Sequence, residues 1–314
     1  VGDLTDGTVD TITGLFANLN VRGAITITGD AKVEGDFTVD SESGSLTVGT
    51  AGANTGLLEA AGNLTIEIGN VAEGDDSLTV YGSLVAGLAL DVDVFGDISL
   101  QGGLTATTGA NLWASGSIEI LGNATVTAAL TAFAGGNLLI DGALTVTEWA
   151  DIDVIGNATI NSTLTVDGYL LLDIGEEGTT TGGAGNLTLN GGLTVGEYAT
   201  ITVLRDITIV GGGEVQGGDF TLTSIEGGLD VLIDPLSGLP GNLNARAGTL
   251  RITVGNANDQ EGTGANIEGD IFASLDVVLQ ITGGMEVSGS ITADTGEVDL
   301  DIWGDLTLRG SLSA

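Results

Sequence analysis

The chain has no cysteine and no histidine among its 314 residues. Their absence excludes disulfide bonds, zinc and haem sites built on these ligands, and Ser-His-Asp or Cys-His catalysis. Basic residues are scarce as well, because six Lys and Arg stand against 43 Asp and Glu, for a formal net charge of −37. Contacts with nucleic-acid phosphates need Lys and Arg, so we expect no nucleic-acid partner.

Long apolar runs are also missing, and proline occurs only twice. No run reaches the ~18 residues of a membrane-spanning helix, so we expect no transmembrane segment. Hydrophobic residues nevertheless make up 42% of the chain, which is too many for a disordered acidic tail. The lack of cysteine, the scarcity of lysine and the acidic composition predict an extracellular or cell-surface location, although an acidic surface also suits a protein from a salt-loving organism. The start at Val1 rather than Met fits either a processed product or a trimmed chain.

A repeat of 20 residues is present instead, marked by Gly82, Gly102, Gly122 and Gly142. Each repeat holds three short runs that alternate apolar and polar residues, which we name the A, B and C strands. The A strands include 98–100, 118–120, 138–140 and 158–160, the B strands follow the repeated glycine, and the C strands include 91–94, 111–114, 131–134 and 151–154. Alternation at period two indicates strands with one buried face.

Residues 20 apart should stack in register, so the inward positions form aliphatic ladders. We expect these ladders at Ile98, Ile118, Leu138 and Ala158 in the A strands, at Leu104, Ala124, Leu144, Leu164 and Leu193 in the B strands, and at Val92, Leu112, Ala132 and Ile152 in the C strands. The sequence therefore predicts an all-β fold, a three-sided parallel β-solenoid (β-helix) with about 20 residues per coil. We expect a single domain over 1–314, with loop insertions at 176–184, 234–247 and 255–266.

The two ends of the chain have similar sequences. Residues 18–26 align without a gap with residues 305–313, and each segment follows a C-strand candidate, 9–12 and 298–302. A second copy could therefore continue the solenoid beyond the last coil, and an open head-to-tail contact produces a filament. The expected interface contains Val9, Ile12, Leu19, Val21, Ile25, Leu306, Leu308 and Leu312.

Segments such as 62–66 (GNLTI), 136–140 (GNLLI) and 185–189 (GNLTL) resemble the repeats of filamentous-haemagglutinin-type adhesins. The resemblance covers about two thirds of the chain and implies an extracellular surface structure without catalytic residues. A weaker similarity is to bactofilins, which are polymerising solenoids.

Outward acidic pairs on the C strands are candidate ligands for a weak calcium site. These pairs are Asp91 with Asp93, Asp151 with Asp153, and Asp299 with Asp301. Carboxylates about 7 Å apart on one strand suit Ca²⁺, which takes oxygen ligands, although a solvated acidic face explains the same pattern. We expect no other cofactor.

Other surface features suggest further roles. Trp113 and Phe133 share an outward position on adjacent coils and could form a lateral contact or a platform for sugars. Five Asn-x-Ser/Thr sequons are candidate glycosylation sites, although asparagine is also common at the corners of a solenoid. The sequons begin at Asn63, Asn123, Asn157, Asn161 and Asn186. Thr-x-Thr pairs recur on successive B strands at 105/107, 125/127 and 145/147. The array resembles the ice-binding face of antifreeze solenoids, although the preference of threonine for β-strands also accounts for it.

These observations predict a structural subunit of an extracellular filament that polymerises head to tail by continuing the β-solenoid. Its partner would be a second copy of itself, with other filaments or surface glycans as further partners. The alternatives are a monomeric stalk or adhesin segment, an ice-binding solenoid and a polysaccharide-active β-helix. Catalytic residues are not expected, because the strongly negative charge does not suit anionic polysaccharides and no acidic triad lies beside a recognisable cleft.

Overall fold

The computed structural model describes residues 7–52, 56–69, 76–175, 185–255 and 264–314. The chain divides into two compact units, Val1–Thr147 and Glu148–Ala314. Every element in the described residues is a β-strand, and no helix there could cross a membrane. The predicted all-β fold is thus confirmed.

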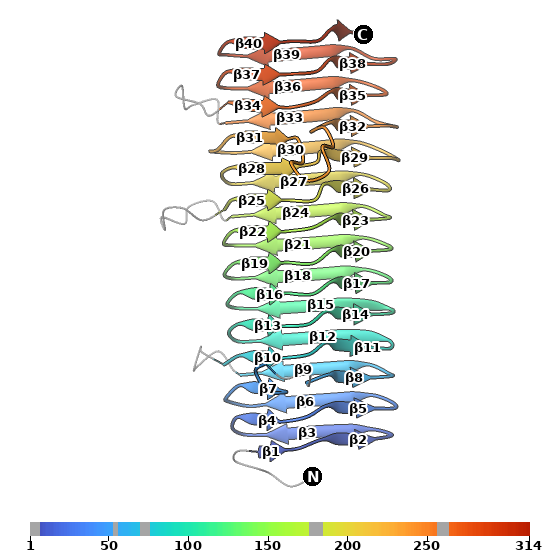
Figure 1. Cartoon of the computed structure of the whole chain (residues 1–314), viewed down its shortest axis with the longest axis vertical. Helices are drawn as coiled ribbons and strands as arrows, with labels where there is room; N and C mark the ends of the chain where they lie inside the picture. The colour runs from blue at the N-terminus through green and yellow to red at the C-terminus, as the bar shows by residue number, and fades with distance from the viewer. Residues whose placement is uncertain (1–6, 53–55, 70–75, 176–184, 256–263) are drawn as a thin grey trace. The chain divides into compact units, whose positions relative to one another are not determined.

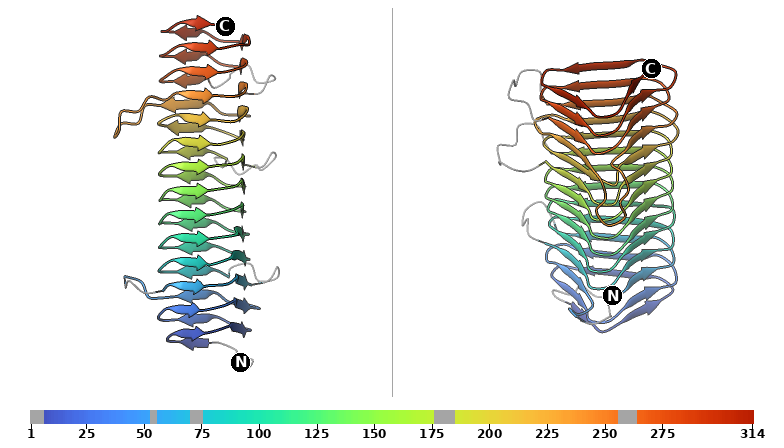
Figure 2. Two further views of the ribbon diagram at one scale, coloured as in Figure 1. Left: turned by 90° about the vertical axis from the view of Figure 1, so that its right-hand side faces the viewer. Right: turned by 45° about the horizontal axis from the view of Figure 1, so that its top comes forward.

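In the first unit the strands form three parallel sheets, one on each side of the coil (Figures 1 and 2). The A strands are, in sheet order, β1 (Gly7–Val9), β4 (Ile25–Ile27), β7 (Leu46–Val48), β10 (Leu78–Val80), β13 (Ile98–Leu100), β16 (Ile118–Ile120) and β19 (Leu138–Ile140). The B strands are β2 (Ile12–Gly14), β5 (Ala31–Val33), β8 (Leu58–Ala60), β11 (Leu84–Ala86), β14 (Leu104–Ala106), β17 (Ala124–Val126) and β20 (Leu144–Val146). The C strands are β3 (Ala17–Val21), β6 (Phe37–Ser41), β9 (Leu64–Ile68), β12 (Ala89–Val94), β15 (Gly109–Ala114) and β18 (Leu130–Ala134).

The second unit repeats this arrangement of three parallel sheets. Its A strands are β22 (Ala158–Ile160), β25 (Leu187–Leu189), β28 (Ile207–Val210), β31 (Leu229–Leu232), β34 (Ala265–Ile267), β37 (Met285–Val287) and β40 (Leu306–Leu308). Its B strands are β23 (Leu164–Val166), β26 (Leu193–Val195), β29 (Gly213–Val215), β32 (Leu243–Ala245), β35 (Ile271–Ala273), β38 (Ile291–Ala293) and β41 (Leu312–Ser313). Its C strands are β21 (Ala150–Val154), β24 (Leu170–Ile174), β27 (Ala199–Val203), β30 (Phe220–Ser224), β33 (Leu250–Val254), β36 (Val277–Ile281) and β39 (Val298–Ile302).

The strands stack in the predicted register. Ile98 pairs with Ile118 in the first unit, and Leu164 pairs with Leu193 in the second, across the nine-residue insertion. All the predicted inward ladder residues are buried, which confirms the inward and outward assignment. The interior of each unit is therefore a set of aliphatic columns, and burying them is the main favourable term in folding.

The first strands differ from the prediction in their class. Val9 ends β1, an A strand, and Ile12 begins β2, a B strand, so 9–12 is not the predicted C strand. Leu19 and Val21 lie in a C strand, β3, and not in the A class that their similarity to Leu306–Leu308 suggested. Because A, B and C strands share the same alternation, sequence similarity between two runs does not identify the side of the coil.

Two predicted loops were too long. Leu243–Ala245 forms β32 within the predicted loop 234–247, and Ala265–Ile267 forms β34, which overlaps the end of the loop 255–266. Both strands pair in register with the strands before and after them, so the coil continues on each side of the insertion. The predicted insertion at 176–184 lies outside the described residues.

Candidate functional site

The acidic pair on β12 lies partly against aromatic side chains. Asp91 is exposed, and its Oδ1 accepts a hydrogen bond of 2.8 Å from Asn111 Nδ2 on the next coil. Asp93 is half-buried and pairs in register with Trp113, and its Oδ1 is shielded from solvent without a hydrogen-bond partner in the described part of the chain. Burial and the neighbouring charge of Asp91 raise the pKa of Asp93. Its carboxylate is thus less available to a cation in solvent than the sequence suggested.

The pair on β21 has a third carboxylate beside it that the sequence analysis missed. Asp153 lies directly opposite Asp173 of β24, and Asp151 lies opposite Leu171. Burial, followed by the charges of Asp153 and Asp151, raises the pKa of Asp173. Adjacent coils therefore place two like charges face to face, an arrangement that costs free energy.

The third pair lies on the last C strand. Asp299 and Asp301 of β39 are exposed and face Val278 and Gln280 of β36. Among the residues that the structure describes, no three Asp or Glu side chains converge as a metal site would require. The three predicted pairs thus lie on separate strands, and calcium binding stays a prediction.

Trp113 and Phe133 contact each other, as their 20-residue spacing indicated. Their rings stack with centroids 5.8 Å apart and planes 13° apart. Phe95 packs edge-on against Trp113 at 5.0 Å, and all three side chains are half-buried. Because stacking covers one face of Trp113 and one face of Phe133, less ring surface remains for a lateral contact than two separate rings would offer.

A second aromatic ladder, in the second unit, escaped the sequence analysis. Tyr169 stacks on Trp149 at 5.7 Å and on Tyr198 at 5.1 Å, with planes within 8° of parallel. Each ring precedes the first inward residue of a C strand. The spacing from 169 to 198 is 29 residues, the 20-residue repeat plus the nine-residue insertion, so correcting for the insertion would have revealed the ladder.

The sequon asparagines lie at coil corners and bond to the next coil. Asn123 Oδ1 accepts a hydrogen bond of 3.0 Å from the Ala143 amide, and Asn63 Oδ1 accepts one of 3.3 Å from the Ala89 amide. In the same way, Asn157 Oδ1 accepts from the Asn186 amide, and Asn186 Oδ1 accepts from the Asp206 amide. Asn161 Oδ1 accepts instead from the side-chain Nδ2 of Asn190. Their corner position thus has a structural explanation, and glycosylation stays a prediction.

The Thr-x-Thr array consists of two columns of threonines, and only the first column lies on the flat face of the B strands. Thr105, Thr125 and Thr145 lie on B strands in register. Thr127 and Thr147 follow the ends of β17 and β20, and the Thr147 hydroxyl donates to the Thr127 carbonyl. The second column therefore lies at a corner and bonds within the protein.

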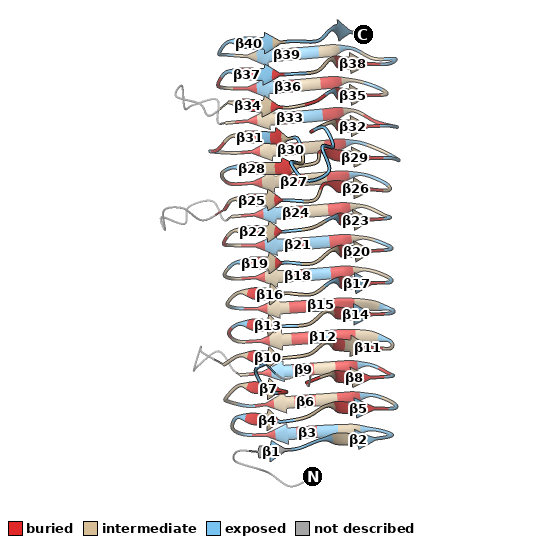
Figure 3. Ribbon diagram, viewed as in Figure 1, coloured by how far each residue is buried: buried red, intermediate tan, exposed pale blue. Residues whose placement is uncertain are grey.

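The predicted assembly residues fall into two groups. Leu19, Val21 and Ile25 are buried in the first unit, Ile12 is half-buried, and the Val9 side chain lies outside the described set. In the second unit, Leu306 is 41% exposed and Leu312 53% exposed, and Leu308 is half-buried (Figure 3). Among the predicted assembly residues whose side chains are described, only Leu306 and Leu312 therefore have a large exposed apolar surface.

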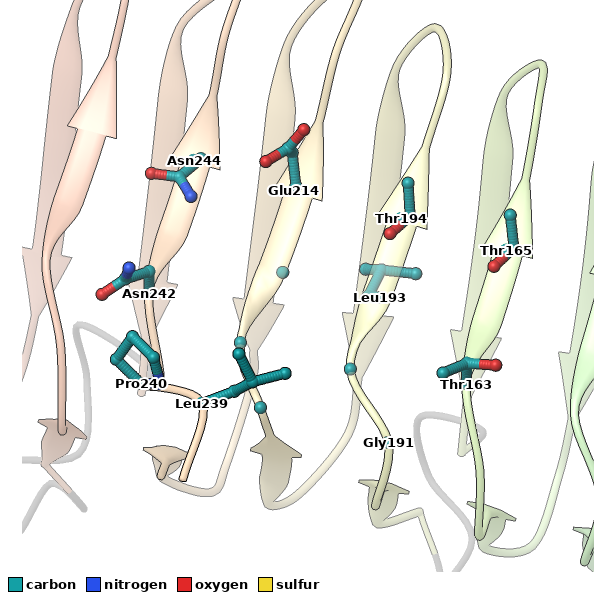
Figure 4. A pocket seen from close by; sticks show the side chains of 14 residues that line it. Thr163, Thr165, Gly191, Leu193, Thr194, Glu214, Leu239, Pro240, Asn242 and Asn244 are labelled. Carbon is teal, nitrogen blue, oxygen red and sulfur yellow. The ribbon is translucent and has the colours of Figure 1, made fainter. Parts of the chain in front are cut away.

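A cavity of about 360 Å³ lies on the B side of the second unit. Its floor contains Thr165, Thr194, Glu214 and Asn244, one from each of four successive B strands, with Thr163 and Asn242 beside them (Figure 4). Leu239 and Pro240 form one wall, and Leu193 and five glycines line the remainder. The cavity combines a polar floor with an apolar wall, and small-molecule sites use both kinds of group.

Comparison of the chain with protein-family models, with curated proteins and with solved structures gives no match.

Proposed function

We propose that the chain is a structural solenoid subunit that associates end to end with further copies of itself. The observation that supports this proposal is the loss of cover over the last coil. Val277, Leu279 and Ile281 of β36 are fully buried, and the residues stacked on them, in β39, are only half-buried. Leu306, Leu312 and Trp303 are more exposed still.

The uncovered coil also presents strand edges. Within the described residues of the second unit, β40 pairs with β37 and β41 pairs with β38, and no strand covers their other sides. Free edges and exposed apolar side chains together favour the addition of strands from another molecule. Fully burying a leucine is worth about 1.5–3 kcal/mol before the cost of association is subtracted.

The first described strands of another copy could supply the cover. β1 is an A strand and β2 is a B strand, so they match the classes of β40 and β41. This junction differs from the sequence prediction, which placed a C strand first. We further propose an extracellular or cell-surface location, supported by the acidic composition and by the resemblance to surface adhesins.

The experiment is sedimentation velocity with negative-stain microscopy of residues 1–314 over a range of concentrations. We expect particles that lengthen with concentration, and we expect Leu306→Asp to remain a single copy, because it places a charge in the junction. Thr307→Asp adds the same charge one residue away on the outward face, and at high salt, where repulsion between outward carboxylates is screened, it should assemble as the wild type does. A wild-type chain that stays monomeric would contradict the proposal and favour a monomeric stalk, and loss of assembly only in Trp113→Ala would favour a lateral contact.

A further inference from the structure

The two prolines of the chain both lie in the segment between β31 and β32, which leaves the coil at 233–241 (Figure 2). The segment is closed by its own hydrogen bonds: Asp234 N to Leu239 O at 2.9 Å, and Gly238 N to Asp234 O at 2.7 Å. The Asp234 carboxylate also accepts from the Leu236 amide and the Ser237 hydroxyl. Proline lowers the conformational entropy of the unfolded chain, so the two prolines and these hydrogen bonds favour the ordered form of the segment.

This segment places apolar surface beside a polar face. Leu239 is 58% exposed, and with Pro240 it forms the wall of the cavity described above. Gly192, Gly211 and Gly212 line the base with φ of +80°, +86° and +79°, a conformation that favours glycine. The absence of side chains at these corners leaves the hollow open.

The floor offers hydrogen-bonding groups at a regular spacing. Thr165, Thr194 and Asn244 are half-buried, and the described part of the structure gives their side chains no hydrogen-bond partner. Neighbouring strands are about 4.8 Å apart, which is close to the length of one sugar ring along an extended oligosaccharide. A ligand lying across the strands would therefore meet one polar side chain per ring.

The charges at the cavity favour an uncharged ligand over an anion. Glu214 is the carboxylate on the floor, and its Oε2 accepts a hydrogen bond of 2.7 Å from Arg246, so the two charges offset each other. The chain as a whole carries −37, which repels anionic ligands. Within the second unit the floor strands β26, β29 and β32 are each paired on both sides, so an extended peptide would find no free edge to join there.

We propose that this cavity binds a neutral oligosaccharide. The hydroxyls of the sugar would bond to the threonine and asparagine side chains, and its C–H face would lie against Leu239 and Pro240. The inference is independent of end-to-end association, because Leu306 and the open coil take no part in it.

The test uses the full chain and a panel of soluble neutral oligosaccharides of glucose, galactose, mannose, xylose and N-acetylglucosamine, with binding followed by saturation-transfer NMR and calorimetry. We expect at least one series to bind, and Thr194→Val to weaken it about threefold to tenfold through loss of one hydrogen bond. Leu239→Ser should weaken the same binding without affecting the fold, because the residue lies outside the core. Thr188→Val, on the A strand β25 and outside the cavity lining, is the matched control and should bind as the wild type does.

Failure of every neutral oligosaccharide to bind at millimolar concentration would overturn the proposal. Unchanged binding in both Thr194→Val and Leu239→Ser would overturn it as well, because the sugar would then bind elsewhere. Binding restricted to anionic saccharides or to peptides would have the same consequence.

Discussion

At the scale of single residues, the inward and outward columns decide which substitutions the fold tolerates. Leu144 is 1% exposed in β20, and Thr145 is the next residue on the outward face. A charge at an inward position has no partner and no water, and a charge at an outward position keeps its hydration. The alternation in the sequence thus predicts mutational sensitivity residue by residue.

We therefore expect Leu144→Asp to destabilise the first unit by at least about 4 kcal/mol, and Thr145→Asp to cost less than about 1 kcal/mol. Hydrogen exchange of the amides in β17 and β20 would measure the local loss, because solenoid coils can unfold separately. Similar exchange in the two variants would contradict the register.

The facing pair Asp153 and Asp173 predicts a pH dependence. The raised pKa of Asp173 means that the folded state holds this proton more tightly than the unfolded state does. Its contribution to stability is therefore greatest at low pH and is lost as pH rises from about the usual value of 3.8 through the raised folded pKa. Asp173→Asn should stabilise the protein near pH 7 by about 0.5 kcal/mol and have little effect near pH 4.

The control for this prediction is Asp301→Asn. Asp301 occupies the equivalent column position in β39, but it faces Gln280 rather than a carboxylate. Thermal melts of both variants between pH 4 and pH 8 would measure the difference. Equal shifts at pH 7 would indicate a general effect of net charge, and would contradict a specific role for the facing pair.

At the scale of elements, the corners join one coil to the next through side-chain oxygens. Asp270 Oδ1 accepts from the Ser290 amide at 2.7 Å, and Asn242 Oδ1 accepts from the Asp270 amide at 2.7 Å. Asp97 makes the same contact with the Ser117 amide in the first unit. These bonds satisfy amides that the strands leave unpaired where the chain turns.

Asp270→Ala should accordingly cost about 1 kcal/mol and speed hydrogen exchange at the Ser290 amide. Asp230→Ala is a suitable control, because Asp230 is an exposed residue in the middle of β31. Unchanged exchange at the Ser290 amide in Asp270→Ala would show that the corner hydrogen bond contributes no measurable stability.

The strands were more predictable than the corners and the insertions. Period-two alternation and the 20-residue repeat determine which residues point inward, so columns such as Ile98 and Ile118 could be assigned from the sequence. The sequence could not show whether an isolated run is an A, B or C strand. Leu19–Val21 and Leu306–Leu308 have the same apolar and polar pattern, yet they lie on different sides of the coil. Strand length is the better signal, since β3 has five residues and β40 has three.

The cavity and the tyrosine ladder depend on spacing that insertions change. Thr165 and Glu214 are 49 residues apart in the sequence and only two strands apart in the sheet. Leu239 reaches the same place from an insertion on another corner. No local motif in the sequence brings these three residues together, so the site became visible only when the coils were stacked.

At the scale of the whole molecule, the charge of −37 opposes both folding and association. Four ion pairs involve the described basic residues Arg22, Lys32, Arg246 and Arg309. The basic side chains of these pairs are all more than half exposed, and pairs at the surface contribute little stability. Most of the acidic side chains therefore repel one another across the coils, and salt should weaken this repulsion.

We expect the melting temperature to rise as NaCl increases from about 10 mM, where the screening length is about 30 Å, to 1 M, where it is about 3 Å. End-to-end assembly should become stronger over the same range, because Asp299 and Asp301 of the uncovered coil would face a second acidic chain. Melting curves and sedimentation in matched buffers would measure both effects. A melting temperature independent of salt would contradict the account of repulsion.

The predicted weak calcium binding adds an effect specific to the ion. If the outward aspartates bind Ca²⁺, replacing NaCl with CaCl₂ at equal ionic strength should raise the melting temperature further, and a chelator should reverse the rise. The increment should shrink in Asp153→Asn, because Asp153 faces Asp173 and the two carboxylates could share one cation. Asp230→Asn, which removes an exposed carboxylate on an A strand, should leave it intact. Identical melting curves in the two salts would mean that the aspartate pairs form only a solvated face, whose role is to keep neighbouring molecules apart.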